Sequence, residues 1–167
     1  LNDGDEAIHT EYGFLQFSQA IKVAGGKSIV AKDNHLTVSV DNILRVVSQK
    51  TRLIYLANAN NPTGTFISKS EVIRLIKSLP KNILLVYDAA YAEYINHTDY
   101  TDGTFLVEKY KNFVMLRTFS KLHGLAALRL GWAYCSREIG NILMSVRGPF
   151  SVNAIAINAG IIAIKDK

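Results

Sequence analysis

Cysteine and long apolar runs are scarce in this chain, and each shortage excludes a class of protein. The only cysteine, Cys135, cannot form a disulfide within the chain, which argues against a disulfide-stapled secreted domain. The most apolar stretch, 154–164, is interrupted by Asn158 and is shorter than the about 20 residues that a membrane-spanning helix needs. No charged segment followed by an apolar one opens the chain, so no targeting signal is indicated. We therefore expect a cytoplasmic protein without a membrane span.

A one-sided charge pattern is also missing. The 19 basic and 14 acidic residues give a net charge of +5, but the lysines are scattered and form no aromatic-interleaved stripe of the kind that binds nucleic acid. We interpret them as a solvated surface and expect neither a nucleic-acid partner nor a metal site. With 167 residues and 49% hydrophobic content, the chain can bury one substantial core.

Short β-branched runs alternate with longer helical patterns, which is typical of a parallel sheet with crossover helices. The sequence predicts an α/β fold, a three-layer, doubly wound and mostly parallel sheet. We expect Asp41 to cap one helix, and Ser68 to cap another in a capping box with Glu71. The expected strands are 7–10, 27–31, 53–57, 83–87, 113–117 and 128–134, and the expected helices include 14–24, 138–146 and 154–164.

Polar side chains follow three of these strands where each strand ends. The runs are Asn58–Gly64, Asp88–Tyr91 and Thr118–Lys121, with Arg129 beyond the last one. If the strands are parallel neighbours, the runs meet at the sheet edge where open α/β sheets bind their ligands. An amide, a carboxylate, a phenol, hydroxyls, an amine and a guanidinium would then share one crevice. Such a set suits a phosphorylated, electron-poor aldehyde cofactor.

The most reactive group in these runs is the Lys121 amine. The mostly apolar stretch 122–125 follows it, and partial desolvation there would lower the pKa of the amine toward a nucleophilic, neutral form. Thr118, Ser120 and Arg129 bring two hydroxyls and a guanidinium that can converge on one phosphate while Lys121 reaches the aldehyde.

The segment Arg117–Gly131, RTFSKLHGLAALRLG, resembles the lysine segment of fold-type-I, pyridoxal-phosphate-dependent aminotransferases, and is most similar to their histidinol-phosphate aminotransferase branch. The similarity extends along the chain, from residues 4–8 and 12–14 to 147–150. It implies pyridoxal 5'-phosphate as cofactor and Lys121 as the Schiff-base lysine. The remaining roles that it implies are Asp88 against the pyridine nitrogen, Asn61 and Tyr91 at the ring 3-hydroxyl, Tyr12 stacked on the ring, and Thr118, Ser120 and Arg129 at the phosphate.

Each of these residue types also has an ordinary structural use. Asp88 can cap the turn after its strand, Tyr12 can be a half-buried aromatic, and Asn61 can serve turn chemistry. The Asn61–Pro62 bond is open to either the cis or the trans form. His123 is next to the lysine, but the resemblance gives it no role, so we do not assign it to the site.

The resemblance implies transamination of histidinol phosphate with 2-oxoglutarate in histidine biosynthesis, by a homodimer that takes a small-molecule amino donor and a 2-oxo acid. It also implies that residues 1–167 are an incomplete large domain, without the family's N-terminal segment and C-terminal small domain. We expect such a fragment to be inactive alone. The alternatives are an aromatic amino-acid aminotransferase, a phospho-amino-acid decarboxylase of the same fold, or an inactive remnant. Ala59 and Ala89 depart from the usual proline and acidic residue, which bears on the subgroup.

Overall fold

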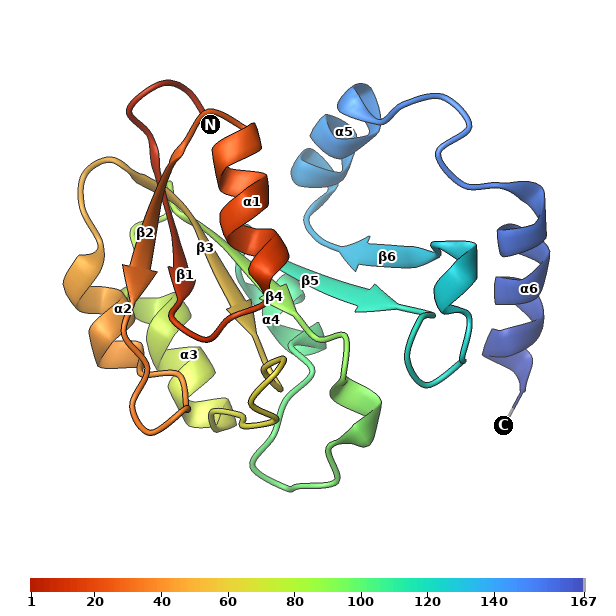
Figure 1. The fold of residues 1–167 in the computed structure, drawn as a ribbon, viewed down its shortest axis with the longest axis horizontal. Helices are drawn as coiled ribbons and strands as arrows, with labels where there is room; N and C mark the ends of the chain where they lie inside the picture. The colour runs from red at the N-terminus through yellow and green to blue at the C-terminus, as the bar shows by residue number, and fades with distance from the viewer. Residues whose placement is uncertain (167) are drawn as a thin grey trace.

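A six-stranded mixed sheet runs through the middle of the molecule, and its strand order is β2-β1-β3-β4-β5-β6. The computed structural model describes residues 1–166. Strands β1 to β5 are parallel and β6 is antiparallel to β5, so the expected α/β, mostly parallel sheet is confirmed (Figure 1). The strands are β1 Glu6–Thr10, β2 Lys27–Ala31, β3 Thr51–Ala57, β4 Leu84–Asp88, β5 Phe113–Thr118 and β6 Gly131–Tyr134.

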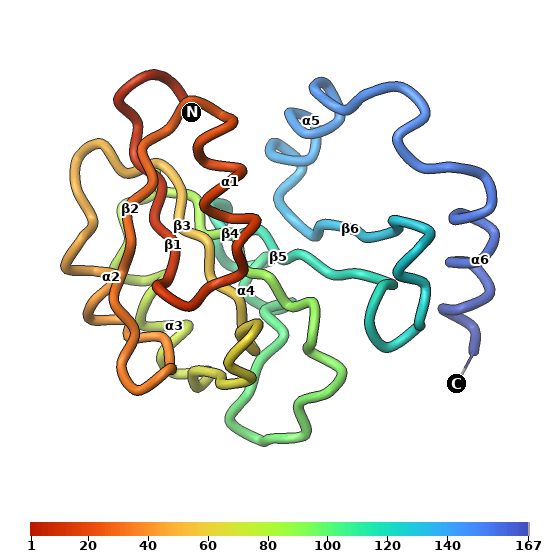
Figure 2. The backbone as a smooth tube through the Cα atoms, in the orientation of Figure 1, coloured from red at the N-terminus to blue at the C-terminus, as the bar shows by residue number. Residues whose placement is uncertain are grey.

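Helices cover both faces of the parallel part of the sheet. In Figure 1, α1 lies in front of the strands, while α2, α3 and α4 lie behind them. The smooth tube in Figure 2 shows that α5 and α6 extend beyond β6, away from the other helices. The helices are α1 Leu15–Val23, α2 Val40–Val46, α3 Lys69–Ser78, α4 Thr104–Lys109, α5 Arg137–Val146 and α6 Ala154–Lys165, with 3-10 turns at Ala92–Tyr94 and Ala126–Leu128.

Alternation along the strands assigns each side chain to one face. Ile54, Leu85 and Phe113 are fully buried together with apolar residues of α2, α3 and α4. On the opposite face, Phe17 of α1 stacks on Tyr55 of β3 with ring centroids 4.9 Å apart. Each fully buried aliphatic or aromatic side chain contributes about 1.5–3 kcal/mol, so these two layers fix the strand positions that the site depends on.

The observed N-termini of α2 and α3 correct two of the expected helix-capping interactions. Ser39, rather than Asp41, caps α2, because its hydroxyl accepts the Asn42 N–H at 3.3 Å. Asp41 lies inside the first turn, where its negative charge faces the positive end of the helix dipole and pairs with Arg74 at 2.8 Å. Ser68 caps α3 as expected, but the Glu71 carboxylate binds Arg74 instead of completing the capping box.

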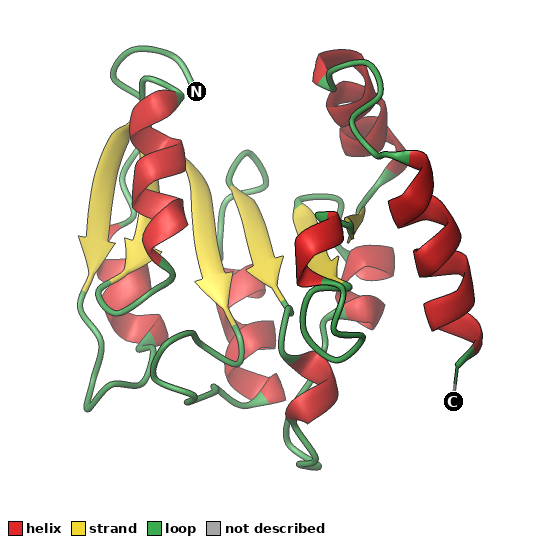
Figure 3. Cartoon of the chain, turned by 45° about the vertical axis from the view of Figure 1, so that its right-hand side comes forward, coloured by secondary structure: helices red, strands yellow, loops and turns green. Residues whose placement is uncertain are grey.

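The expected strand 128–134 is wrong in its first half. Residues 126–128 form a 3-10 turn, and the extended part begins at Gly131, where the chain reverses and pairs with β5. The β5 and β6 arrows point in opposite directions in Figure 1, and Figure 3 shows the loops at the ends of the parallel strands. None of the helices within residues 1–166 combines the length and the apolar character needed to cross a membrane.

Candidate functional site

The carboxyl ends of β3, β4 and β5 meet at one edge of the sheet. In the parallel register Ala57 lies opposite Asp88, and Asp88 lies opposite Leu116. A crevice of about 60 Å³ opens at this edge. Its lining confirms that the three polar runs meet there: Phe14, Ala57, Ala59, Asn61, Asp88, Ala90, Tyr91 and Lys121.

Asp88 is the carboxylate of this crevice. Its Oδ1 accepts a hydrogen bond from the Ala90 N–H at 3.0 Å, so the side chain caps the following turn and lines the crevice at the same time. Burial raises the pKa of the Asp88 carboxyl, and the Ala90 hydrogen bond and the charge of Lys121 act in the opposite direction. Within residues 1–166 the other oxygen, Oδ2, has no hydrogen-bond donor, so it can accept one from a ligand.

Lys121 enters the crevice from the turn after β5. Its Nζ lies 4.9 Å from the centroid of the Tyr91 ring, a cation–π distance. We expected the stretch 122–125 to desolvate the amine in part. Leu122, the first residue of that stretch, is 53% exposed, and the aromatic contact of the amine comes from Tyr91. Within residues 1–166, neither the Asn61 amide nor the Tyr91 hydroxyl makes a hydrogen bond within 3.5 Å, so both are available to a ligand.

Arg129 closes the turn that carries the lysine. Its Nη1 donates to the Ala126 carbonyl at 2.7 Å and to the Ser120 hydroxyl at 3.5 Å. Its backbone is left-handed, with φ of 55°, a conformation that costs free energy in a residue other than glycine. A guanidinium and a hydroxyl are thereby held together at the end of β5.

The Thr118 hydroxyl makes two hydrogen bonds within the turn that carries the lysine. Its hydroxyl accepts the Ser120 N–H at 3.0 Å and donates to the Leu130 carbonyl at 3.4 Å. The Phe119 N–H also donates to Leu130, at 3.1 Å, so the two ends of the turn are joined. Thr118 therefore shapes the turn that presents Ser120 and Arg129, and its own role toward a phosphate stays a prediction.

At the start of α1, the structure puts Phe14 rather than Tyr12 in the crevice. Tyr12 and Phe14 are about equally exposed, at 44% and 43%, but only Phe14 lines the crevice. The Tyr12 carbonyl accepts a hydrogen bond from the Asn60 amide at 3.0 Å. Sequence reasoning missed Phe14, and the signal for it was its position directly before a helix that begins near the site. Ring stacking by Tyr12 stays a prediction.

Buried hydrogen bonds connect the asparagine-rich turn after β3 to neighbouring parts of the core. The Asn58 amide donates to Ile67 O at 3.1 Å and to the Tyr87 hydroxyl at 2.9 Å, and it accepts the Ile67 N–H at 2.8 Å. Tyr87 donates in turn to Thr101 O, and the Tyr100 hydroxyl donates to Asn58 O at 2.7 Å. Burial is the main reason that the pKa of Tyr100 is raised to about 12.

The donor set fits a planar cofactor that carries an aldehyde and a phosphate. An amine lies beside a carboxylate, an amide and a phenol in the crevice, and a guanidinium paired with a hydroxyl lies on the adjoining turn. The first group matches a hydroxylated pyridine ring with an aldehyde, and the second matches a phosphate. The Asn61–Pro62 peptide bond beside the crevice is cis.

Comparison with known proteins agrees with this geometry. The curated histidinol-phosphate aminotransferases of Rhodospirillum centenum and Maricaulis maris are each 47% identical to the chain, over 98% and 100% of it and over 45% and 46% of their own length. The crystal structure of histidinol-phosphate aminotransferase from Sinorhizobium meliloti in complex with pyridoxal-5'-phosphate matches 99% of the chain and 45% of its own length, with 26% identity and a TM-score of 0.93. The chain thus spans about half the length of these relatives. Residues 1–167 match the family described as aminotransferase class I and II, and the chain belongs to that family.

Proposed function

We propose that the chain is the cofactor-binding part of a pyridoxal-phosphate-dependent aminotransferase that moves an amino group from histidinol phosphate to 2-oxoglutarate in histidine biosynthesis. The observation that carries this proposal is the shared crevice of Lys121 and Asp88 at the carboxyl edge of the sheet. Family membership and the names of the 47% identical relatives support the reaction class and the substrate.

In this proposal, each side of the cofactor has a matching group. Ser120 and Arg129 would hold the phosphate, Asn61 and Tyr91 would bind the ring oxygen, and the Asp88 carboxylate would pair with the ring nitrogen. Pyridoxal phosphate supplies a positively charged ring that withdraws electrons from the substrate carbon. An ionised Asp88 keeps the ring nitrogen protonated, which preserves that withdrawing power.

Lys121 has two tasks at one atom. Its Nζ is the only amine among the lining residues of the crevice, so it is the group that would hold the cofactor through its aldehyde carbon, with release of water. Once released from the cofactor, the same Nζ would be the group of this crevice that accepts a proton from the substrate and returns it. Tyr91 contacts the amine and keeps it over the crevice in both tasks.

The lysine assignment is tested by borohydride reduction of the cofactor-loaded protein. Lys121→Ala abolishes the reducible adduct, whereas Lys111→Ala, which changes an exposed lysine at the other end of β5, leaves it intact. Peptide mapping identifies the modified residue. An adduct that maps to another lysine in the unmodified protein contradicts the proposal.

The substrate is tested with the full-length protein that carries this chain. Amino transfer to 2-oxoglutarate is measured from histidinol phosphate, tyrosine and phenylalanine in parallel, and we expect kcat/KM to be highest for histidinol phosphate. Comparable values for all three indicate the aromatic aminotransferase alternative, and release of carbon dioxide from a phosphorylated amino acid indicates the decarboxylase. Cofactor binding without turnover of any substrate indicates an inactive remnant.

We further propose that the full-length protein is a cytoplasmic homodimer, as the family resemblance implies. Sedimentation equilibrium of the cofactor-loaded protein gives its mass directly, and a monomer at micromolar concentration contradicts the dimer.

A further inference from the structure

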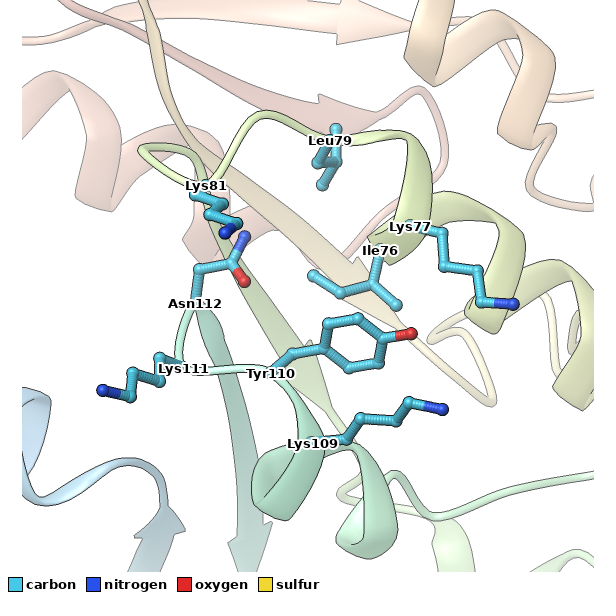
Figure 4. A pocket seen from close by; sticks show the side chains of 8 residues that line it. All are labelled: Ile76, Lys77, Leu79, Lys81, Lys109, Tyr110, Lys111 and Asn112. Carbon is cyan, nitrogen blue, oxygen red and sulfur yellow. The ribbon is translucent and has the colours of Figure 1, made fainter.

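Four lysines gather at the opposite edge of the sheet, around the amino ends of β4 and β5. They border a cavity of about 350 Å³, within the size range of small-molecule sites. Figure 4 shows them around the cavity, with the Lys111 side chain pointing away and the Lys81 ammonium near the Asn112 amide. The four are Lys77 at the end of α3, Lys81 before β4, and Lys109 and Lys111 on either side of Tyr110.

The floor of this cavity is apolar. Ile76 is 2% exposed, and it belongs with Leu79 to the core behind α3. In Figure 4 the Tyr110 ring lies beside Ile76, and its hydroxyl points toward the side where the ammonium groups of Lys77 and Lys109 lie. The Lys109 Nζ is 5.9 Å from the centroid of this ring. A flat apolar body can rest on this floor while its charges reach the rim.

The positive charge of the rim is not neutralised by neighbouring side chains. Within residues 1–166, no carboxylate lies within 4.0 Å of any of the four ammonium groups, and the cavity lining contains no acidic residue. A second, adjoining cavity is also lined by Lys81 and Lys111, and one carboxylate, Glu138, is among its lining residues. A hollow lined by one sign of charge concentrates counter-ions, so the cavity attracts anions.

Hydrogen bonds hold the backbone around the cavity in place. The Asn112 amide donates to Ile83 O at 2.9 Å, and the Asn112 carbonyl accepts the Leu85 N–H at 2.9 Å. The Tyr110 N–H donates to Leu106 O at 2.8 Å. The loops before β4 and β5 are thus tied to each other and to α4, and a preorganised site loses less free energy on binding.

We propose that this cavity binds a small organic anion with a flat apolar body and two or more negative charges, of the nucleoside polyphosphate type. The body rests on Ile76 and Tyr110, and the charges lie between Lys77 and Lys109. The site is separate from the proposed cofactor site, because the five residues of β4 put about 15 Å between the two edges of the sheet. It does not rest on the proposed function.

The test is a calorimetric titration of the purified protein with magnesium-free ATP. We expect saturable binding at one site per chain. Lys77→Gln combined with Lys109→Gln weakens it at least tenfold, and Lys81→Gln combined with Lys111→Gln weakens it less. The matched control is Lys22→Gln with Lys50→Gln, which removes the same charge elsewhere and changes the affinity less than twofold. Far-ultraviolet circular dichroism confirms that each variant is folded.

Two further titrations separate the alternatives. Tripolyphosphate, which has the charge without the body, binds at least fivefold more weakly than ATP if the apolar floor contributes. Arg129→Ala leaves ATP affinity unchanged if the anion is not at the proposed cofactor phosphate site. Equal weakening by the cavity pair and the control pair, equal affinity for tripolyphosphate and ATP, or loss of binding in Arg129→Ala each overturns the proposal. None of these readouts depends on transaminase activity.

Discussion

Arg129 carries the phosphate end of the proposed cofactor site. Each charge-assisted hydrogen bond from its guanidinium contributes roughly 1.5–3 kcal/mol, so we expect Arg129→Ala to weaken cofactor affinity by about tenfold or more. Equilibrium dialysis of the full-length protein against pyridoxal phosphate measures this change. Arg137→Ala, which removes an exposed guanidinium at the start of α5, is the matched control. Unchanged cofactor retention in Arg129→Ala contradicts the assignment.

Burial of the Asp88 carboxyl in the crevice lowers the stability of the folded chain when this group is ionised. Because burial raises the pKa of its carboxyl above the ordinary 3.8, the folded chain holds the proton more firmly than the unfolded chain does. The stability of the fold therefore decreases as the pH rises from about 3.8 through the folded-state pKa, and the cost persists at pH 7.

We expect Asp88→Asn to leave the free energy of unfolding at pH 7 unchanged or higher by up to about 1 kcal/mol, the common scale of a single substitution. The same variant is expected to lower amino transfer strongly, since an amide cannot stabilise a protonated ring nitrogen. Urea unfolding at pH 7 and pH 3 measures the first effect, and the difference from the parent protein disappears at pH 3. A clear loss of stability at pH 7 shows that the ionised carboxylate is favourable.

Single residues of the site differed in how far the sequence could predict them. Asp88 ends β4, and Asn61 and Lys121 lie in the loops directly after β3 and β5, so the parallel topology brings them to one edge of the sheet. Phe14 and Tyr12 lie in a loop before α1, and which of the two rings lines the crevice depends on the path of that loop. A loop has no periodic pattern from which this could be predicted.

Strand β4 depends on the buried Asn58, Tyr87 and Thr101 hydrogen bonds. Tyr87→Phe removes the hydroxyl that satisfies Thr101 O and one Asn58 N–H, and leaving buried polar groups unpaired costs about 1–3 kcal/mol. Urea unfolding of the variant measures this loss. Tyr134→Phe on β6 is the control, because that ring is partly exposed and the change is expected to be within about 0.5 kcal/mol. Equal stability of both variants contradicts the structural role of the network.

The elements were predictable where one signal dominated. Strands β3 and β5 are dense in branched apolar residues and were placed within two residues of their ends. The sequence indicated Asp41 as the cap of α2, but the extended backbone at Ser39 puts the cap two residues earlier. The reversal before β6 depends on the left-handed conformation at Arg129, which residue type does not signal, since glycine is the usual choice there.

The molecule as a whole has an uneven surface. Apolar side chains are buried between the sheet and α1 to α4, but many remain exposed over β6, α5 and α6. They include Trp132, Ile142, Leu143, Met144, Phe150, Ile157 and Ile161. This region is where we expect the isolated chain to associate.

Ile157 and Ile161 lie one turn apart on α6, and each is about half exposed. Replacing both with Ser is expected to lower binding of an apolar fluorescent dye and to reduce concentration-dependent association at least twofold, because the contiguous apolar area shrinks. Sedimentation velocity over a concentration series measures association. Leu15→Ser with Val23→Ser removes two exposed apolar side chains of α1 and is the control. The same reduction in both variants places the associating surface elsewhere.

The residues of the proposed cofactor site come from two pieces of the fold, the β5–β6 hairpin and the ends of the parallel strands. Lys121 and Arg129 belong to a single hairpin whose ends are joined through Phe119 and Leu130, whereas Asp88 and Asn61 come from the parallel strands. The spacing of the amine and the guanidinium is therefore set by neighbours in the chain, and their distance to the carboxylate is set by the sheet. A molecule bound to both pieces acts as a cross-link between them, so it protects the hairpin from proteolysis as well as filling the crevice.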